Sequence, residues 1–82
     1  MGTKLLVIDD DPNICDLLKF YFENEGYEVK TANDGIEGLS YFKMYEPDLV
    51  LLDLMLPKNK DGNQVCREIR AISSKPIIMI TA

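Results

Sequence analysis

Two short apolar runs in this chain end directly in aspartates. Residues 5–8 lead into three consecutive aspartates at 9–11, and residues 49–52 lead into Asp53. A continuous apolar run without alternation is typical of a strand that is buried on both faces, as the central strands of a parallel sheet are. Open α/β sheets place their functional sites at the carboxyl ends of such strands. The pattern therefore predicts a parallel α/β domain with an acidic site at one edge of its sheet.

Helix and strand signals alternate along the rest of the chain. Asp11 and Pro12 supply an N-cap and a first-turn proline, and Gly26 is typical of the residue just past a helix end. Asp34 and Glu37 have the spacing of a capping box at the start of a second helix. The sequence predicts strands at about 4–8, 27–32, 48–52 and 77–80, and helices over about 12–25, from Asp34 to before Pro47, and around Val65, Ile69 and Ile72.

This order of elements predicts one small α/β domain. Strands that alternate with helices imply right-handed crossovers and a mostly parallel sheet with helices on both faces. A chain of 82 residues is enough for one such domain with four strands and three helices, and its core is thin. Met44, Met55 and Met79 fall at helical or strand spacing, and we expect them to fill that core.

The charge of the chain favours a cation over nucleic acid as an electrostatic partner. The formal net charge is -5, and the nine Lys and Arg residues are scattered along the sequence. Nonspecific binding to nucleic acid needs clustered basic residues that neutralise phosphates. We therefore expect no direct nucleic-acid binding by this chain.

Cysteine usage and hydropathy exclude two further classes of site. Cys15 and Cys66 lie far apart and the chain has no histidine, so a structural zinc site is not expected, and both are predicted to be buried, reduced thiols. No apolar run approaches the roughly 20 residues of a membrane-spanning helix. We expect a cytoplasmic protein with no membrane association.

Asp9, Asp10 and Asp53 are predicted to converge if the first and third strands are neighbours. Several carboxylates at short distance repel one another unless one is protonated or a divalent cation binds. Mg²⁺ suits an all-oxygen, partly hydrated site, and a carboxylate beside it can act as a nucleophile toward phosphorus. Thr81 follows the last apolar run, where its hydroxyl would reach a phosphoryl oxygen. Asp11 is more simply interpreted as a helix cap than as a metal ligand.

Five segments of the chain resemble the receiver domain of two-component response regulators, and the resemblance covers the whole sequence. These segments are Val7-Ile8-Asp9-Asp10-Asp11-Pro12, Asp34-Gly35, Leu51-Leu52-Asp53-Leu54-Met55-Leu56-Pro57, Asp61-Gly62 and Ile78-Met79-Ile80-Thr81-Ala82. The resemblance implies a flavodoxin-like α/β fold. It also implies a role in phosphorelay signalling, in which a sensor histidine kinase phosphorylates the domain.

The same resemblance assigns roles to individual residues. Asp53 would be the phosphoacceptor, and Mg²⁺ would be the cofactor. Asp10 would bind Mg²⁺ directly, Asp9 mainly through water, and the Met55 backbone carbonyl would complete the protein ligands together with Asp53. Thr81 would be the switch hydroxyl, with Ala82 beside it leaving room for the phosphoryl group.

The chain departs from the family pattern in two places. Residues 58–60 separate Pro57 from Asp61, where the family usually has two residues in this position. After the pair at 81–82, the family pattern continues with a helix, a fifth strand that ends in a lysine, an aromatic switch residue and a final helix. We therefore expect residues 1–82 to form a single partial receiver domain without its last helix-strand-helix portion. We also expect a homodimer through the exposed edge strand at 77–80 and the uncovered sheet faces.

Three functions compete for these residues. The first is a phosphoacceptor, which is not an enzyme beyond weak self-phosphorylation and autodephosphorylation. The second is a self-associating structural fragment whose acid pocket is inactive. The third is a phosphatase similar to the haloacid dehalogenases, in which Asp9 would be the nucleophile and Asp11 the acid and base. Phosphorylation at Asp53 and not at Asp9 would distinguish the first from the third.

Overall fold

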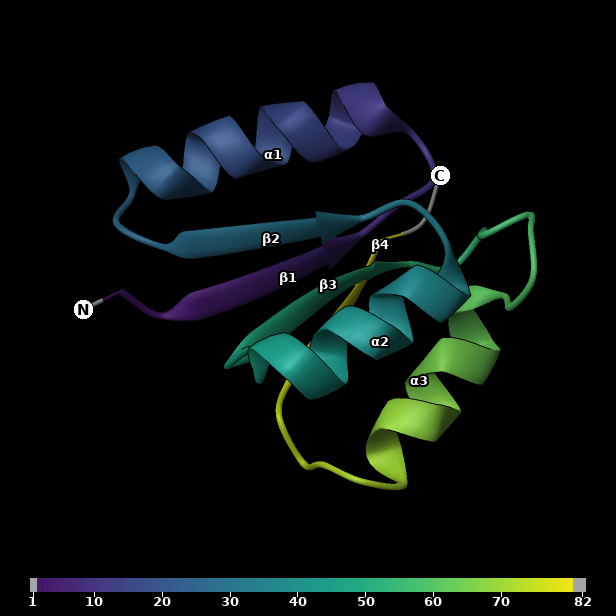
Figure 1. Ribbon diagram of the computed structural model, residues 1–82. Coiled ribbons are helices and arrows are strands. Elements are labelled where there is room, and N and C mark those ends of the chain that lie inside the picture. Colours follow the sequence, from purple (N-terminus) through teal and green to yellow (C-terminus); the bar gives the residue numbers. More distant parts are fainter. Residues whose placement is uncertain (1, 81–82) are drawn as a thin grey trace.

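The computed structural model describes residues 2–80 and consists of strands and helices that alternate along the chain (Figure 1). The strands are β1 (Lys4–Ile8), β2 (Glu28–Ala32), β3 (Leu49–Asp53) and β4 (Ile77–Ile80), and the helices are α1 (Pro12–Asn24), α2 (Gly35–Tyr45) and α3 (Gly62–Arg70). This confirms the predicted order of elements. The first two helices lie within one or two residues of their predicted bounds.

The four strands form one parallel sheet in the order β2-β1-β3-β4. Strand β1 lies between β2 and β3, so the two strands that lead into aspartates are neighbours. Their register pairs Ile8 with Leu52, and the next pair of strands aligns Asp53 with Ile80. All three strands β1, β3 and β4 therefore end at the same edge of the sheet.

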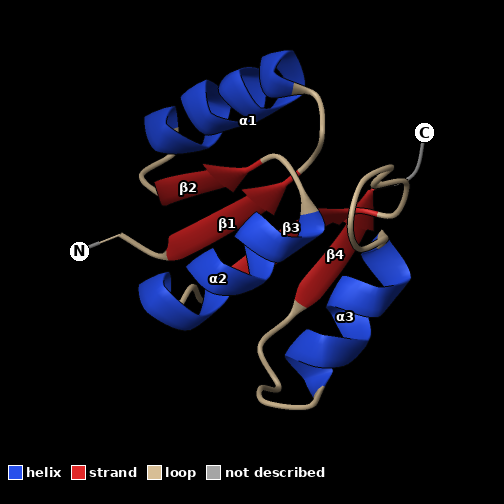
Figure 2. Cartoon of the chain, turned by 45° about the vertical axis from the view of Figure 1, so that its right-hand side comes forward, coloured by secondary structure: helices blue, strands red, loops and turns tan. Residues whose placement is uncertain are grey.

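Helices cover both faces of the sheet, as predicted, but unequally. Helix α1 lies on one face, and α2 and α3 lie on the other (Figures 1 and 2). Residues Leu6 and Ile8 of β1 belong to the hydrophobic cluster on the α2 and α3 side, whereas Leu5 and Val7 belong to the cluster beneath α1. All four side chains are fully buried, which explains why this strand is continuously apolar.

Aspartate side chains cap the start of each helix. Asp11 accepts a hydrogen bond from the backbone N–H of Asn13, which confirms its interpretation as a cap. Asp34 accepts from the N–H of Glu37, as a capping box requires. The Glu37 carboxylate accepts from the backbone N–H of Asn33 at 2.8 Å, one residue before the cap, so the return bond of this box is displaced by one position.

All three of the expected core methionines lie at the surface. Met44 is 76% exposed and Met55 is 67% exposed, and Met79 is also exposed. Met44 occupies the outer side of α2, and Met55 is followed by Leu56, whose side chain is buried in its place. The core therefore consists mainly of aliphatic strand and helix residues, together with Phe42 and Cys15, rather than of these methionines.

The predicted third helix extends too far, and one predicted thiol is less buried than expected. Helix α3 ends at Arg70, so Ile72 lies in the turn beyond it with an exposed side chain. The Arg70 guanidinium donates to the backbone carbonyls of Ser73 and Lys75, and these bonds favour a turn over another helical residue. Cys15 is buried as predicted, whereas Cys66 is partly exposed.

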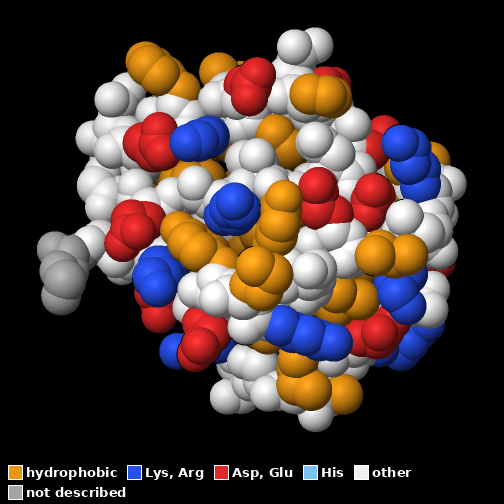
Figure 3. All heavy atoms as spheres, viewed as in Figure 1, with side chains coloured by type: hydrophobic (Ala, Val, Ile, Leu, Met, Phe, Trp, Pro, Cys, Tyr) orange, Lys and Arg blue, Asp and Glu red, His pale blue; other side chains and the backbone are white. Residues whose placement is uncertain are grey.

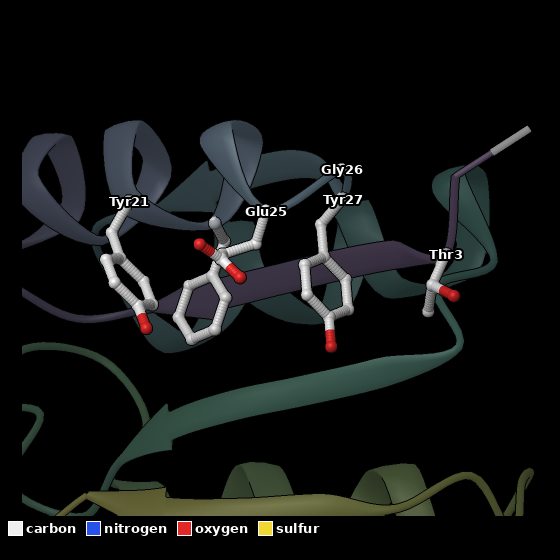
Figure 4. Close-up of a pocket in the computed structure, with 6 residues that line it drawn as sticks. Thr3, Tyr21, Glu25, Gly26 and Tyr27 are labelled. Atoms are coloured by element: carbon white, nitrogen blue, oxygen red, sulfur yellow. The ribbon is translucent and has the colours of Figure 1, made fainter.

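The face beneath α1 is only half covered by helix, because α1 packs on β2 and β1. The side chain of Ile78 in β4 is 52% exposed. Near the start of β1, the rings of Tyr21, Phe22 and Tyr27 stack edge to face and line an open groove of about 410 Å³ (Figure 4). Of the predicted site residues that the structure describes, Asp9, Asp10, Asp53 and Met55 do not line this groove, because they lie at the opposite ends of the strands.

Charged side chains of both signs share the surface. On the face seen in Figure 3, Lys and Arg alternate with Asp and Glu and form no continuous basic area there. Among residues 2–80, none of the helices combines the length and the apolar character needed to span a membrane.

Candidate functional site

Three carboxylates meet where β1 and β3 end. Asp9 and Asp10 follow β1 directly, and Asp53 is the last residue of β3. One oxygen atom from each of the three side chains lies within 4.8 Å of the other two. Asp9 is 3% exposed and Asp53 is 9% exposed, whereas Asp10 is open to solvent. The structure thus brings together the three acidic residues that the sequence placed in one site.

Burial and mutual repulsion act on the innermost carboxylate. Burial raises the pKa of Asp9 above its usual value, and the hydrogen bond from the Asp11 backbone N–H partly opposes that rise. The negative charges of Asp53, Asp10 and Asp11 raise the pKa of Asp9 further. Within residues 2–80, no Lys or Arg forms an ion pair with any of the three site carboxylates. The site therefore concentrates negative charge that no Lys or Arg of the described residues offsets by an ion pair.

The free oxygen atoms of this cluster fit a hard divalent cation. Asp9 and Asp53 each use Oδ1 to accept one backbone hydrogen bond, from Asp11 and from Met55 respectively, both at 2.9 Å. Within the described part of the chain, their Oδ2 atoms accept no protein hydrogen bond. Oxygen donors at this spacing, with one carboxylate open to solvent, match the partly hydrated coordination that Mg²⁺ prefers.

The loop after β3 is anchored close to Asp53. The N–H of Gly62 donates to the carbonyl of Leu54 at 3.2 Å, which closes the base of the loop. A Cβ at position 62 would lie 2.5 Å from the Asp53 carbonyl oxygen, so only glycine permits this approach. Met55 begins the loop with its N–H bonded to Asp53, and its backbone therefore lies beside the site. This is the residue whose carbonyl was predicted as a metal ligand.

The loop that is one residue longer than the family pattern contacts α2 through Asn59. The Asn59 side-chain oxygen accepts hydrogen bonds from the backbone N–H groups of Ile36, at 3.1 Å, and Lys60, at 2.8 Å. Lys60 also pairs with Glu68 at 2.7 Å. A Cβ at Gly35 would approach the Lys60 Cβ to 2.7 Å, so the loop lies directly on the first residue of α2. The loop is thus tied to both α2 and α3.

The predicted switch hydroxyl belongs to the residue that directly follows β4. Thr81 and its neighbour Ala82 lie outside the described residues. The strand that precedes them ends level with the acidic cluster, because Ile80 is paired with Asp53 and its carbonyl accepts from the N–H of Leu54 at 3.1 Å.

Sequence reasoning missed two residues that contact the site. The Asn33 side-chain amide donates to the backbone carbonyl of Asp9 at 3.0 Å, and the Cys15 thiol contacts the same carbonyl at 3.4 Å. Burial raises the pKa of the Cys15 thiol to about 11, so it stays protonated at neutral pH. A predicted strand register would have indicated Asn33. Ile8 pairs with Ala32, so the residues that follow them, Asp9 and Asn33, lie beside each other. Nothing in the sequence pattern singled out Cys15 in this role.

Comparisons with known proteins agree with this site. A family model described as the response regulator receiver domain matches residues 5–82. The chain is similar to response regulator protein TrrA from Thermotoga maritima, which was solved in complex with Mg²⁺ and BeF: identity is 43%, the TM-score is 0.90, and the match covers 98% of this chain and 70% of that one.

Two receiver domains give comparable matches. The BeF3-activated receiver domain of RstA from Klebsiella pneumoniae is 34% identical with a TM-score of 0.91, and the match covers 96% of this chain and 67% of that one. The receiver domain of the Francisella response regulator 1452 is 32% identical with a TM-score of 0.91, over 99% of this chain and 67% of that one. The chain thus spans about two thirds of the length of these solved chains.

Proposed function

The chain belongs to the response regulator receiver domain family, and we propose that it is a phosphoacceptor of two-component signalling. In this proposal Asp53 receives a phosphoryl group from the phosphohistidine of a sensor histidine kinase. The observation that carries the proposal is the convergence of Asp9, Asp10 and Asp53 at the carboxyl ends of β1 and β3. We propose a cytoplasmic location for this step.

The chemical step requires a nucleophile that is fixed in position. An Oδ atom of Asp53 attacks phosphorus and forms a P–O bond. The P–N bond to the donor histidine breaks, and its electron pair stays on the imidazole nitrogen. The bond between Asp53 Oδ1 and the N–H of Met55 holds the carboxylate and leaves Oδ2 free for the attack. Catalysis of phosphoryl transfer depends mostly on such positioning and on charge stabilisation.

Mg²⁺ is the proposed cofactor, because it supplies positive charge that offsets the charge of the phosphoryl oxygens. Asp10, which is exposed, would bind it directly together with Asp53, and the buried Asp9 would bind it mainly through water. The Met55 backbone carbonyl would be the remaining protein ligand. Thr81 is proposed as the hydroxyl that contacts the transferred group.

The domain is proposed to be a phosphoacceptor and not an enzyme. Its own activity would be limited to weak self-phosphorylation from small phosphodonors and to slow loss of the phosphoryl group. The contacts of Asp11 argue against the alternative of a phosphatase that uses Asp9. In that alternative Asp11 would be the acid and base, whereas here its side chain caps α1 and its N–H is bonded to Asp9.

Intact-mass spectrometry after incubation with acetyl phosphate and Mg²⁺ tests the proposal. We expect one phosphoryl adduct on the wild-type chain and none when Mg²⁺ is chelated. Asp53→Asn keeps the shape of the side chain and should abolish the adduct. Asp16→Asn changes an exposed aspartate on α1 and should leave it unchanged. A wild-type chain without an adduct, or an adduct that survives Asp53→Asn, would contradict the proposal.

Self-association is a second candidate property, and the exposure of β4 favours it. Within residues 2–80, β4 pairs only with β3, and Ile78 and Met79 are both exposed. Edge strands with apolar side chains tend to pair with another chain. A homodimer through β4 and the half-covered sheet face is therefore proposed. Light scattering at micromolar concentration should give the mass of two chains, and a monomer would refute it.

A further inference from the structure

Asn33 and Cys15 converge on a single backbone atom of the acidic site. Asn33 lies between β2 and α2, and Cys15 lies on the first turns of α1. The Asn33 Nδ2 group donates to the Asp9 carbonyl oxygen at 3.0 Å, and Cys15 Sγ lies 3.4 Å from the same oxygen. The two side chains also contact each other, with 3.5 Å between Nδ2 and Sγ.

These contacts fix the peptide that connects Asp9 to Asp10. Strand β1 ends at Ile8, so its regular pairing does not extend to Asp10. The N–H of Asp9 still donates to the Ala32 carbonyl at 3.0 Å, and its carbonyl is held by Asn33 and Cys15. Because that carbonyl belongs to the peptide between the two aspartates, its direction sets where the Asp10 backbone begins.

The backbone of Asn33 is itself fixed by a hydrogen bond. Its backbone N–H donates to the Glu37 carboxylate at 2.8 Å, which fixes the main chain of the loop. The residue is exposed, yet its amide group turns inward to the Asp9 carbonyl and the Cys15 sulfur. An exposed asparagine gains little stability from one neutral hydrogen bond, because water is the alternative partner. The contact therefore matters mainly for geometry.

We propose that Asn33 and Cys15 are positioning residues that orient the Asp9–Asp10 peptide and so preorganise the pair of carboxylates for a divalent cation. This inference rests on the proposed function, since it concerns the same cation site. Groups that orient metal ligands from a second layer typically change metal affinity by about 10- to 100-fold when removed. Because these two act on the backbone next to the ligands, we expect a change of about tenfold, at the lower end of that range.

The test measures Mg²⁺ affinity directly, without a phosphodonor. Titration of the full chain with MgCl₂, followed by amide chemical shifts, gives the dissociation constant of each variant. Asn33→Ala should weaken binding about tenfold. Asn24→Ala is the matched control, because Asn24 is an exposed asparagine at the far end of α1 and should bind as the wild type does.

The thiol provides a second and independent pair of variants. Cys15→Ala removes the donor, whereas Cys15→Ser keeps a hydroxyl that can bond the Asp9 carbonyl. We expect weaker binding for alanine and recovery for serine. Thermal unfolding without Mg²⁺ checks that each variant is folded at the titration temperature. If Cys15 had only a structural role, Cys15→Ala would lower the thermal stability, and Cys15→Ser would not restore the Mg²⁺ affinity.

The outcomes separate this inference from the function on which it rests. If the wild type binds Mg²⁺ and Asn33→Ala and Cys15→Ala bind it within twofold of the wild type, the positioning role is wrong and the proposed function stands. If the wild type binds no Mg²⁺, the proposed function fails and this inference fails with it. A tenfold loss in both variants, with rescue by Cys15→Ser, supports the positioning role.

Discussion

Ile8 in β1 and Leu52 in β3 are paired in the parallel sheet, and the next residue after each is an aspartate. This one register brings Asp9 and Asp53 to the same edge of the sheet. Both are largely buried, so their charges act on each other through a medium that screens less than water does. The acidic cluster follows from the pairing of two apolar strands rather than from a local loop motif.

Replacing the innermost carboxylate should stabilise the chain when no divalent cation is present. Burial raises the pKa of Asp9 in the folded chain above its value in the unfolded chain. The contribution of this group to the free energy of unfolding is therefore fully present below the unfolded pKa and is lost as pH rises through the folded pKa. Asp9→Asn removes that loss and keeps the Oδ1 acceptor for Asp11. We expect Asp9→Asn to have a higher free energy of unfolding than the wild type, as measured by urea denaturation at pH 7 in the presence of a chelator.

The gain from Asp9→Asn should shrink as pH falls toward the usual pKa of an aspartate, because both folded and unfolded chains then hold the proton. Asp16→Asn, an exposed site on α1, is the control and should show no comparable gain. A lower stability for Asp9→Asn at pH 7 would show that burial of the Asp9 charge and its repulsion by the neighbouring carboxylates do not limit the stability of the chain.

Magnesium should raise the melting temperature of the wild-type chain. A ligand that binds only the folded state at one hundred times its dissociation constant adds about 2.7 kcal/mol of stability. Asp10→Asn and Asp53→Asn each remove one proposed ligand charge, so both should reduce the shift. Scanning calorimetry with MgCl₂ measures it, with NaCl of equal ionic strength as the control. An equal shift in both salts would mean that general screening, and not binding, stabilises the chain.

The loop contact made by Asn59 should contribute to stability. Its side chain satisfies the N–H of Ile36 in the first turn of α2, a group that has no partner within the helix. We expect Asn59→Ala to lower the free energy of unfolding by about 0.5 to 1.5 kcal/mol, the usual net worth of one hydrogen bond. Urea denaturation followed by circular dichroism measures this, with Lys58→Ala in the same exposed loop as the control. Equal effects of the two substitutions would refute a stabilising role of the Asn59 side chain at the start of α2.

The two thiols should differ in reactivity. Cys15 is buried and its pKa is raised to about 11, so little of it is thiolate at neutral pH. Cys66 is partly exposed on α3. We expect iodoacetamide at pH 8 to alkylate Cys66 first in the folded chain, whereas both react in urea. Mass mapping of alkylated peptides over time follows this, and equal rates in the folded chain would contradict the buried position of Cys15.

Much of the fold was predictable because the strongest signals are local. The buried runs of β1 and β3, the aspartate caps and the glycine after α1 each specify an element without tertiary information. The acidic site was predictable for the same reason, since Asp9, Asp10 and Asp53 directly follow or end these strands. The receiver-like motifs implied a flavodoxin-like fold, which periodicity alone does not give.

Other features depend on contacts between residues that are distant in the sequence, and local sequence patterns did not indicate them. Met44 has helical spacing, yet which side of α2 it occupies depends on where the sheet lies. The end of α3 before Ile72 depends on the Arg70 bonds to two later carbonyls. The role of Asn59 required the loop to lie against α2, a contact between residues 23 positions apart. These outcomes are set by packing, which sequence patterns do not resolve.

Phosphorylation at Asp53 is the step on which the proposed function depends. Its most direct test is to incubate the wild-type chain with acetyl phosphate and Mg²⁺, reduce the acyl phosphate with borohydride and locate the converted aspartate by peptide sequencing in a mass spectrometer. We expect conversion at Asp53 alone. Conversion at Asp9 would indicate phosphatase-like chemistry, and either that result or the absence of any converted residue would refute Asp53 as the phosphoacceptor.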